Sequence, residues 1–309
     1  MLKQKSSLKT HIMPDLGSKR EKCIHNMPCV ADLYIVSADS KDINVPLKGL
    51  NLEGSISNST ASMSYIQTFK NEQSEPIEWL YKFPSDRYYS VTGLNVKVGE
   101  KEIDAQIMEK EKAEEEYDDA VAAGHTAVKM NVDKKLPDVI ELNIGQLQAG
   151  QEAVITVKMV CQLEVVKPGY FTFMFPLEFI PRYGSKDTNG GVVGEENTHM
   201  PAKFEMKMSI ISTSTITNLF KSHKEIKMEN NEDDTELILT IEPEESLEAK
   251  DLVLSFSTEH IREPQISLTK CEKFPGEVAA HISFIPRCSE EPTHSKELFY
   301  CFFGFLMKR

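Results

Sequence analysis

Five acidic side chains occupy positions 114–119, and a histidine follows them at position 125. Carboxylates and imidazoles are the groups that bind divalent cations and move protons. Consecutive residues of a helix point in different directions, so at most Glu115 and one of Asp118 or Asp119 share a face. A hard cation needs several convergent oxygens. The cluster is therefore interpreted as a solvated acidic face, with a basic partner surface as the alternative.

His125 has no recognisable catalytic or metal-binding partner in the sequence. No serine or cysteine nucleophile can be assigned to it, and no second histidine stands at metal-ligand spacing. The sequence also contains no Gly-rich phosphate loop, Gly-x-Ser-x-Gly elbow or His-Glu-x-x-His motif. We therefore predict that the protein is not an enzyme and that it has no catalytic, cofactor-binding or metal-binding residues.

The acidic cluster belongs to a stretch, 103–130, in which the apolar period changes twice. Residues 103–107 alternate as in a strand, apolar residues then recur at spacings of three and four, and alternation returns after Gly124. This pattern predicts one amphipathic helix that docks on a sheet, ends at a glycine cap and is tied to the next strand by a histidine. The residues with these roles are Tyr117, Ala120, Val121, Gly124 and His125.

The remainder of the chain shows the period of two that is typical of strands. Ile77, Trp79, Tyr81 and Phe83 form the clearest case, and they are predicted to lie in the core. About eight such segments precede residue 185, and a smaller set follows residue 200. The predicted fold is mostly β: an antiparallel β-sandwich with one amphipathic helix, followed by a smaller antiparallel β module.

Two groups of aromatic residues are candidates for interaction with another protein. Tyr88 and Tyr89 are predicted to lie in an exposed loop after Pro84. The apolar run Leu298–Met307 is predicted to form a strand that pairs with a nearby sheet, binds a partner by strand addition, or aggregates. The aromatic candidates are Tyr88, Tyr89, Phe302, Phe303 and Phe305.

Charge and cysteine content narrow the class of protein. The net charge is −13, although the first 25 residues hold six basic against two acidic side chains, so nucleic acid is not expected as a partner. No run has the roughly 18 apolar residues of a membrane helix. The six cysteines are dispersed without CxxC spacing, and no secretory signal is visible. A cytoplasmic protein with protein partners is expected.

Several segments, in this order, resemble the vault protein–inter-alpha-trypsin (VIT) domain, over about residues 29–185. They are VPLKGLNLEG (45–54), QTFKNEQSEPIEWLYKFP (67–84), EKEKAEEEYDDAVAAGHTA (109–127), DVIELNIGQLQAGQEAVITVKMV (138–160) and FIPRY (179–183). In one branch of this family a β linker module and then a von Willebrand factor A domain follow. The first A-domain strand there leads into an Asp-x-Ser-x-Ser metal site, whereas residues 301–307 here read CFFGFLM.

The resemblance implies a domain order and a function. We expect a disordered basic tail (1–28), a VIT domain (29–185), a linker (186–200), a β linker module (201–270) and a remnant lead-in to an absent A domain (271–309). The implied function is a non-enzymatic intracellular scaffold that is truncated before the A-domain metal site. The alternatives are a secreted inter-alpha-trypsin heavy-chain-like matrix protein and the non-catalytic part of a vault-associated ADP-ribosyltransferase.

Overall fold

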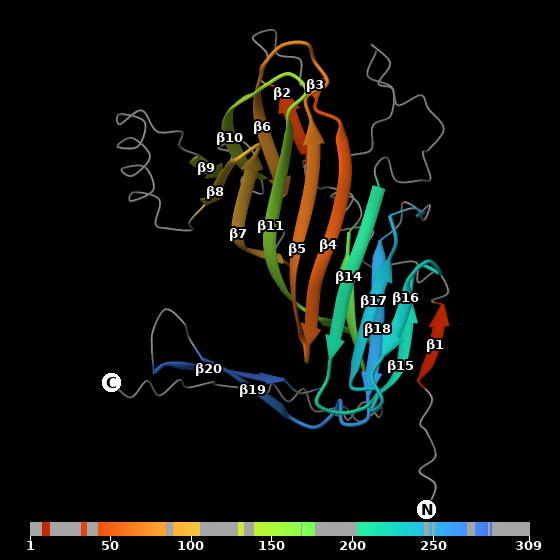
Figure 1. Ribbon diagram of the computed structural model, residues 1–309. Coiled ribbons are helices and arrows are strands. Elements are labelled where there is room, and N and C mark those ends of the chain that lie inside the picture. Colours follow the sequence, from red (N-terminus) through yellow and green to blue (C-terminus); the bar gives the residue numbers. More distant parts are fainter. Residues whose placement is uncertain are drawn as a thin grey trace, which may run out of the picture. The chain divides into compact units, whose positions relative to one another are not determined.

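A computed structural model defines the fold as an assembly of strands (Figure 1). The residues it describes are 8–12, 32–35, 43–84, 89–105, 129–132, 139–167, 169–176, 203–243, 247–248, 251–270, 276–283 and 285. None of these residues is helical, so none of them lies in a helix that could cross a membrane. The predicted helix falls within 106–128, outside the described residues. The chain divides into two compact units, Met1–Ile261 and Arg262–Arg309.

The largest sheet of the first unit has eight strands within the described residues, in the order β16-β17-β14-β4-β5-β11-β7-β8. Its strands are β4 (Leu47–Ser57), β5 (Thr60–Lys70), β7 (Tyr89–Val98), β8 (Lys101–Ala105), β11 (Glu152–Gln162), β14 (Lys203–Ile211), β16 (Lys227–Asn230) and β17 (Glu236–Ile241). Successive side chains of a strand point to opposite faces. β5 accordingly buries every second residue from Ala61 to Phe69.

Two sheets of five described strands complete this unit. One has the order β3-β2-β6-β10-β9, and its strands are β2 (Asp32–Ile35), β3 (Ile43–Asn44), β6 (Ile77–Pro84), β9 (Lys129–Val132) and β10 (Val139–Leu147). The other has the order β1-β15-β18-β13-β12, and its strands are β1 (Lys9–Ile12), β12 (Glu164–Lys167), β13 (Tyr170–Phe175), β15 (Ile216–Lys221) and β18 (Leu252–Thr258).

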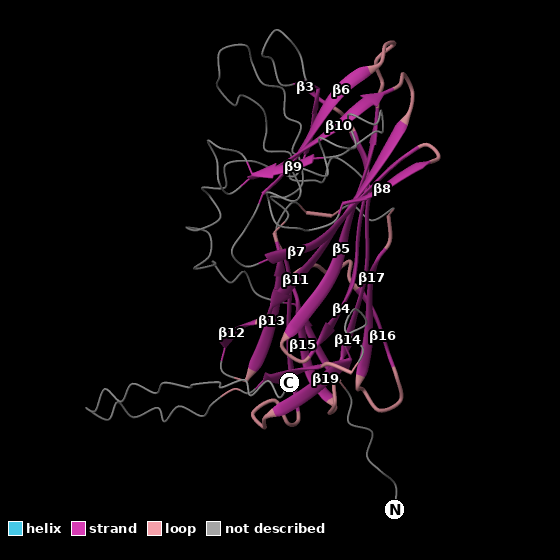
Figure 2. Cartoon of the chain, turned by 90° about the vertical axis from the view of Figure 1, so that its left-hand side faces the viewer, coloured by secondary structure: helices cyan, strands magenta, loops and turns pink. Residues whose placement is uncertain are grey.

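Tyr65 shows how the three sheets meet. It is fully buried on β5, with its ring centroid 6.2 Å from that of Phe83 on β6 and 5.5 Å from that of Phe175 on β13. Both five-stranded sheets therefore pack on the same face of the large sheet, β6 and β10 toward one end and β13 and β12 toward the other (Figure 2). The predicted β-sandwich is confirmed, and so is the core position of Trp79, which is 2% exposed.

A polar pair lies inside this apolar core. Gln67 on β5 is fully buried, and its Oε1 accepts a hydrogen bond of 2.7 Å from the hydroxyl of Tyr81 on β6. A buried polar group is stable only where its hydrogen bonds are made. This bond therefore fixes how the two facing sheets are positioned against each other.

We expect Tyr81→Phe to lower the free energy of unfolding by about 1–2 kcal/mol, because it leaves a buried acceptor without this donor. Urea denaturation measures the change. A double-mutant cycle with Gln67→Leu isolates the pair, and the two substitutions should not be additive. Strict additivity would show that the hydroxyl and the amide do not act together.

The strands between residues 200 and 261 belong to the large sheet and to the five-stranded sheet that contains β13. β14 pairs with β4 in parallel, with Met206 opposite Leu52, whereas the other neighbours in the large sheet are antiparallel. β18 pairs with β13 in the second layer. The strands predicted as a smaller module thus share hydrogen-bonded sheets with the strands before residue 185. A local period of two cannot reveal such a junction, because it does not identify the neighbouring strand.

Four residues of the predicted disordered tail are ordered. Lys9–Ile12 form β1, which pairs in parallel with β15 at the edge of its sheet. Disorder was expected from the polar and basic composition of residues 1–28. That expectation is wrong for these four residues, because backbone hydrogen bonds to an existing strand need no apolar pattern in the added segment.

The second unit contains one described hairpin. Strands β19 (Gln265–Lys270) and β20 (Val278–Ser283) are antiparallel, with Ile266 opposite Ile282 and Leu268 opposite Ala280. Val278, Ala280 and Ile282 give β20 the period of two that is typical of strands.

Candidate interaction surfaces

Most of the residues singled out from the sequence lie outside the described residues, so their roles stay predictions. These residues are Tyr88, Tyr117, Ala120, Val121, Gly124, His125, Phe302, Phe303 and Phe305. Tyr89 is described, and it does not lie in an exposed loop: it begins β7 opposite Cys161 and is 7% exposed. Its hydroxyl donates to the carbonyl oxygen of Met174 on β13. The register of β7 against β11 turns this ring into the sandwich, so the prediction of exposure is wrong.

The described part of the chain contains no group of three or more His, Cys, Asp or Glu side chains that could hold a metal ion. His223 is its one described histidine that is buried, and the ring has protein partners on both sides. Its Nδ1 lies 2.7 Å from the Ser222 hydroxyl, and its Nε2 lies 3.2 Å from the carbonyl oxygen of Glu248. Such a ring, held between a hydroxyl and a carbonyl, has a structural role.

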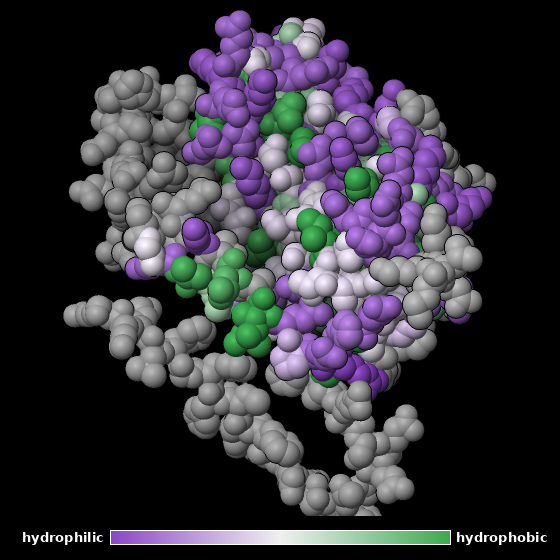
Figure 3. All heavy atoms as spheres, turned by 60° about the horizontal axis from the view of Figure 1, so that its bottom comes forward, coloured by the Kyte–Doolittle hydropathy of each residue, from purple (hydrophilic) through white to green (hydrophobic). Residues whose placement is uncertain are grey.

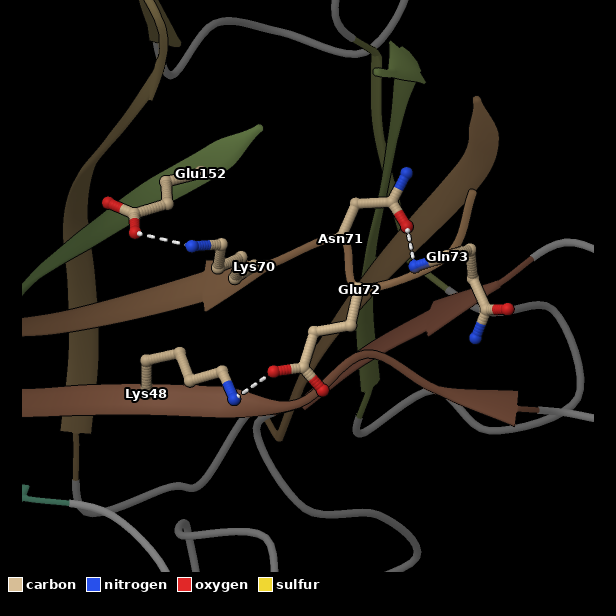
Figure 4. Close-up of polar contacts among 6 residues, drawn as sticks. All are labelled: Lys48, Lys70, Asn71, Glu72, Gln73 and Glu152. Carbon is tan, nitrogen blue, oxygen red and sulfur yellow. Dashed lines mark hydrogen bonds and ion pairs between the residues drawn. The ribbon is translucent and has the colours of Figure 1, made fainter. Parts of the chain in front are cut away.

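Asn71 is the centre of the polar contacts at the end of β5 (Figure 4). It is fully buried, and its Nδ2 donates to the carbonyl oxygens of Glu75 at 3.0 Å, Leu147 at 3.0 Å and Gln148 at 3.1 Å. Its Oδ1 accepts a bond of 2.9 Å from the amide of Gln73. One side chain thereby joins the turn after β5 to the turn between β10 and β11.

The backbone and two ion pairs reinforce this joint. The Asn71 amide donates to the carbonyl of Gln151 at 3.0 Å, and the Gly150 amide donates to the carbonyl of Asn71 at 2.9 Å. Lys48 pairs with Glu72 beside the turn, and Lys70 lies 3.8 Å from Glu152 (Figure 4). These ion pairs are largely exposed and contribute little energy. The cluster is a structural joint between two of the segments that carry the family resemblance.

The edge of β15 is the first candidate surface for binding another polypeptide. β1 lies along it in parallel, with Thr10 opposite Leu219 and His11 opposite Phe220. The ring centroids of His11 and Phe220 are 5.0 Å apart and the rings are nearly stacked, at 25°. The described side chains of β1, Lys9, Thr10 and His11, are exposed. Besides the backbone pairing, β1 makes this ring contact and a weak hydrogen bond of 3.9 Å from the Thr10 hydroxyl to the sulfur of Met228.

Two residues of β15, Phe220 and Lys221, also contact other parts of the chain. The ring of Tyr170 meets Phe220 edge-on at 5.6 Å. Lys221 donates to the carbonyl oxygen of Ile226, and burial lowers the pKa of its amine, an effect that the charge of Glu225 partly opposes. Phe220 and Lys221 on β15 thus have partners other than β1.

The apolar face of the β19–β20 hairpin is the second candidate surface. The large apolar side chains on this face are Ile266, Leu268, Val278 and Ile282, with exposed fractions of 63%, 69%, 56% and 48%. The register places them on one side of the hairpin, with Ala280 and Lys270 between them. Figure 3 shows apolar side chains gathered in a green patch on this hairpin. Surface patches of this kind mark interaction sites in soluble proteins.

Comparison with known proteins supports the family resemblance. Residues 47–159 match the vault protein inter-alpha-trypsin domain, inside the range of about 29–185 expected from the sequence. Von Willebrand factor A domain-containing protein 5A of Homo sapiens is 33% identical over 148 residues, which cover 47% of this chain and 19% of that protein. Protein mono-ADP-ribosyltransferase PARP4 of Homo sapiens is 30% identical over 191 residues, which cover 59% of this chain and 11% of that protein.

A solved structure of an M1 zinc metallopeptidase from Deinococcus radiodurans is a distant match. Its TM-score is 0.34 at 9% identity, over 82% of this chain and 48% of that one, which is too low to assign a shared function. The match to the first two relatives spans less than a fifth of the length of either. Residues 47–159 thus match the VIT domain, and 47% of the chain is similar to part of von Willebrand factor A domain-containing protein 5A.

Proposed function

We propose that this protein is a non-enzymatic interaction scaffold that binds extended polypeptide segments at the edge of β15. One observation carries the proposal: a segment remote in sequence, β1, is already added to that edge in parallel. Strand addition of this kind gives affinity through main-chain hydrogen bonds and specificity through individual side chains. Here the stack of His11 on Phe220 supplies the side-chain contact.

The comparisons support an interaction role. A protein named for an A domain and one named as an ADP-ribosyltransferase are each similar to part of this chain, and residues 47–159 match the VIT domain. Similarity to proteins of such different kinds is more consistent with a binding module than with a catalytic one. Residues 1–309 contain no Asp-x-Ser-x-Ser motif. We therefore propose that binding at β15 needs no divalent cation.

The expected result is that a labelled peptide of residues 6–14 binds a chain lacking residues 1–12 and binds the full chain at least tenfold more weakly. The tethered β1 competes at an effective concentration in the millimolar range. Fluorescence anisotropy measures both affinities, with and without a chelator. A His11→Ala peptide should bind more weakly, because it loses the ring stack, and a scrambled peptide is the control.

Equal affinity for both chains would contradict the proposal, as would binding of the scrambled peptide. Phe220→Ala in the shortened chain is the matching change on the protein side. It should weaken binding of the native peptide, whereas the affinity of the His11→Ala peptide should fall little further. Circular dichroism shows whether each chain keeps its sheets.

We also propose a cytoplasmic location. The six cysteines are dispersed along the sequence without CxxC spacing, as a reducing compartment allows. The secreted alternative would place a glycan on Asn58, in the sequon Asn58-Ser59-Thr60. Asn58 is only 8% exposed and lies in the tight β4–β5 turn with φ at 52°. Cell fractionation tests the location, and a glycosylated form in the medium would overturn it.

A further inference from the structure

The β19–β20 hairpin has one face that its own strands cannot cover. Ile266 lies opposite Ile282, Leu268 opposite Ala280, and Val278 opposite Lys270, so the apolar side chains share one side. The other side carries polar residues such as His281 and Ser283. An isolated two-stranded hairpin is marginally stable in water, and a covering element is what stabilises an amphipathic one. Within the described residues of Arg262–Arg309 there is no third strand.

An apolar segment follows this hairpin closely in the sequence. The run Leu298–Met307 reads LFYCFFGFLM, and 12 residues separate it from Ile285, the last described residue of the unit. Twelve residues reach up to about 40 Å when extended. The hairpin strands have six residues each, about 20 Å in length. The connection can therefore return the run along the whole face, whichever direction it takes.

We infer that Leu298–Met307 lies against the apolar face of the β19–β20 hairpin and covers Ile266, Leu268, Val278 and Ile282. The residues between, 286–297, are polar and charged, as expected of an exposed connection. A tether of this length holds the run at a millimolar effective concentration. A second copy of the chain or a separate partner reaches such a concentration only rarely, so the segment of the same chain is favoured. This surface is independent of the peptide site proposed at β15.

Two adjacent alanines allow a direct test. Ala280 lies on the apolar face and Ala279 on the opposite face, and both are exposed. Each is changed to cysteine in the full chain, and the rate of alkylation at that site is followed by peptide mass spectrometry. We expect Ala280→Cys to react at least tenfold more slowly than Ala279→Cys. Deleting residues 298–309 should remove that difference.

A second variant keeps the length of the chain. The double substitution Phe302→Asp with Phe305→Asp should raise the alkylation rate of Ala280→Cys as the deletion does. Neither the deletion nor the double substitution should alter the rate at Ala279→Cys. Equal rates at both sites in the full chain would overturn the inference, since the face would then be uncovered. Protection that persists after the deletion would overturn it too. Protection that grows with protein concentration would replace the inference with self-association of two copies.

Discussion

Asn71→Asp is expected to lower the free energy of unfolding by about 3–5 kcal/mol. The substitution keeps the size of the side chain but removes the Nδ2 donor that three carbonyl oxygens share, at 3.0, 3.0 and 3.1 Å. It also places a carboxylate against those oxygens in a fully buried position. Urea denaturation followed by tryptophan fluorescence measures the change, because Trp79 is 2% exposed and lies on β6 directly after this turn.

The matched control is Asn231→Asp. Asn231 is an exposed turn residue whose Oδ1 accepts from the amides of Thr235 at 2.9 Å and Glu236 at 3.1 Å. A carboxylate keeps both of these acceptor roles, so the cost should stay below about 1 kcal/mol. The loss of unfolding free energy caused by Asn71→Ala should lie between those of the two aspartate variants, since alanine removes the donor without adding a charge. Similar midpoints for Asn71→Asp and Asn231→Asp would mean that the joint between the turns does not stabilise the fold.

Gly54→Ala is expected to destabilise the large sheet by about 2–3 kcal/mol. Gly54 lies on β4 between β5 and β14, opposite Met63 on one side and Met208 on the other. A Cβ there would lie 2.3 Å from the carbonyl oxygen of Ser62 and 2.8 Å from the Cα of Met63. These are backbone atoms, so β5 would have to move, and it is hydrogen-bonded along its whole length to β4 and β11. Thermal unfolding monitored by circular dichroism measures the loss.

Gly49→Ala on the same strand is the control. A Cβ at Gly49 would meet only the side chain of Thr68, at 3.9 and 4.0 Å, which is ordinary contact. This substitution should change stability by less than about 1 kcal/mol. If both alanine variants melt together, the close approach of β4 and β5 at Gly54 is not a constraint on the fold.

Local patterns in the sequence are sufficient to identify which residues face the core. Alternation placed Trp79 and Tyr81 inside, and both are at most 2% exposed. The turn that joins β7 to β8 has Gly99 in the positive-φ conformation that glycine favours. These features follow from short-range rules: a strand sends alternate side chains to opposite faces, and a glycine supplies a positive φ at a turn. The family segments then gave the VIT assignment, which the match over residues 47–159 supports.

The pairing of distant strands is what only the tertiary structure decided. The parallel junction of β14 with β4 and the addition of β1 to β15 depend on backbone groups, which every residue except proline presents alike. A period of two therefore shows which face a residue occupies but not which strand lies beside it. Tyr89 was misassigned for the same reason, since its burial follows from pairing with Cys161.

The contacts of Asn71 likewise depend in part on the local sequence and in part on the tertiary structure. The surrounding residues Asn71–Pro76 are of types that are typical of turns. The partners of Asn71, Leu147 and Gln148, lie 76 and 77 residues away along the chain, and only the packed sandwich brings them within hydrogen-bond distance. The sequence thus determined most of the strands, many of the core faces and the resemblance to the VIT domain. The folded chain decided which edges and faces are open to a partner, because those depend on neighbours that are remote in sequence.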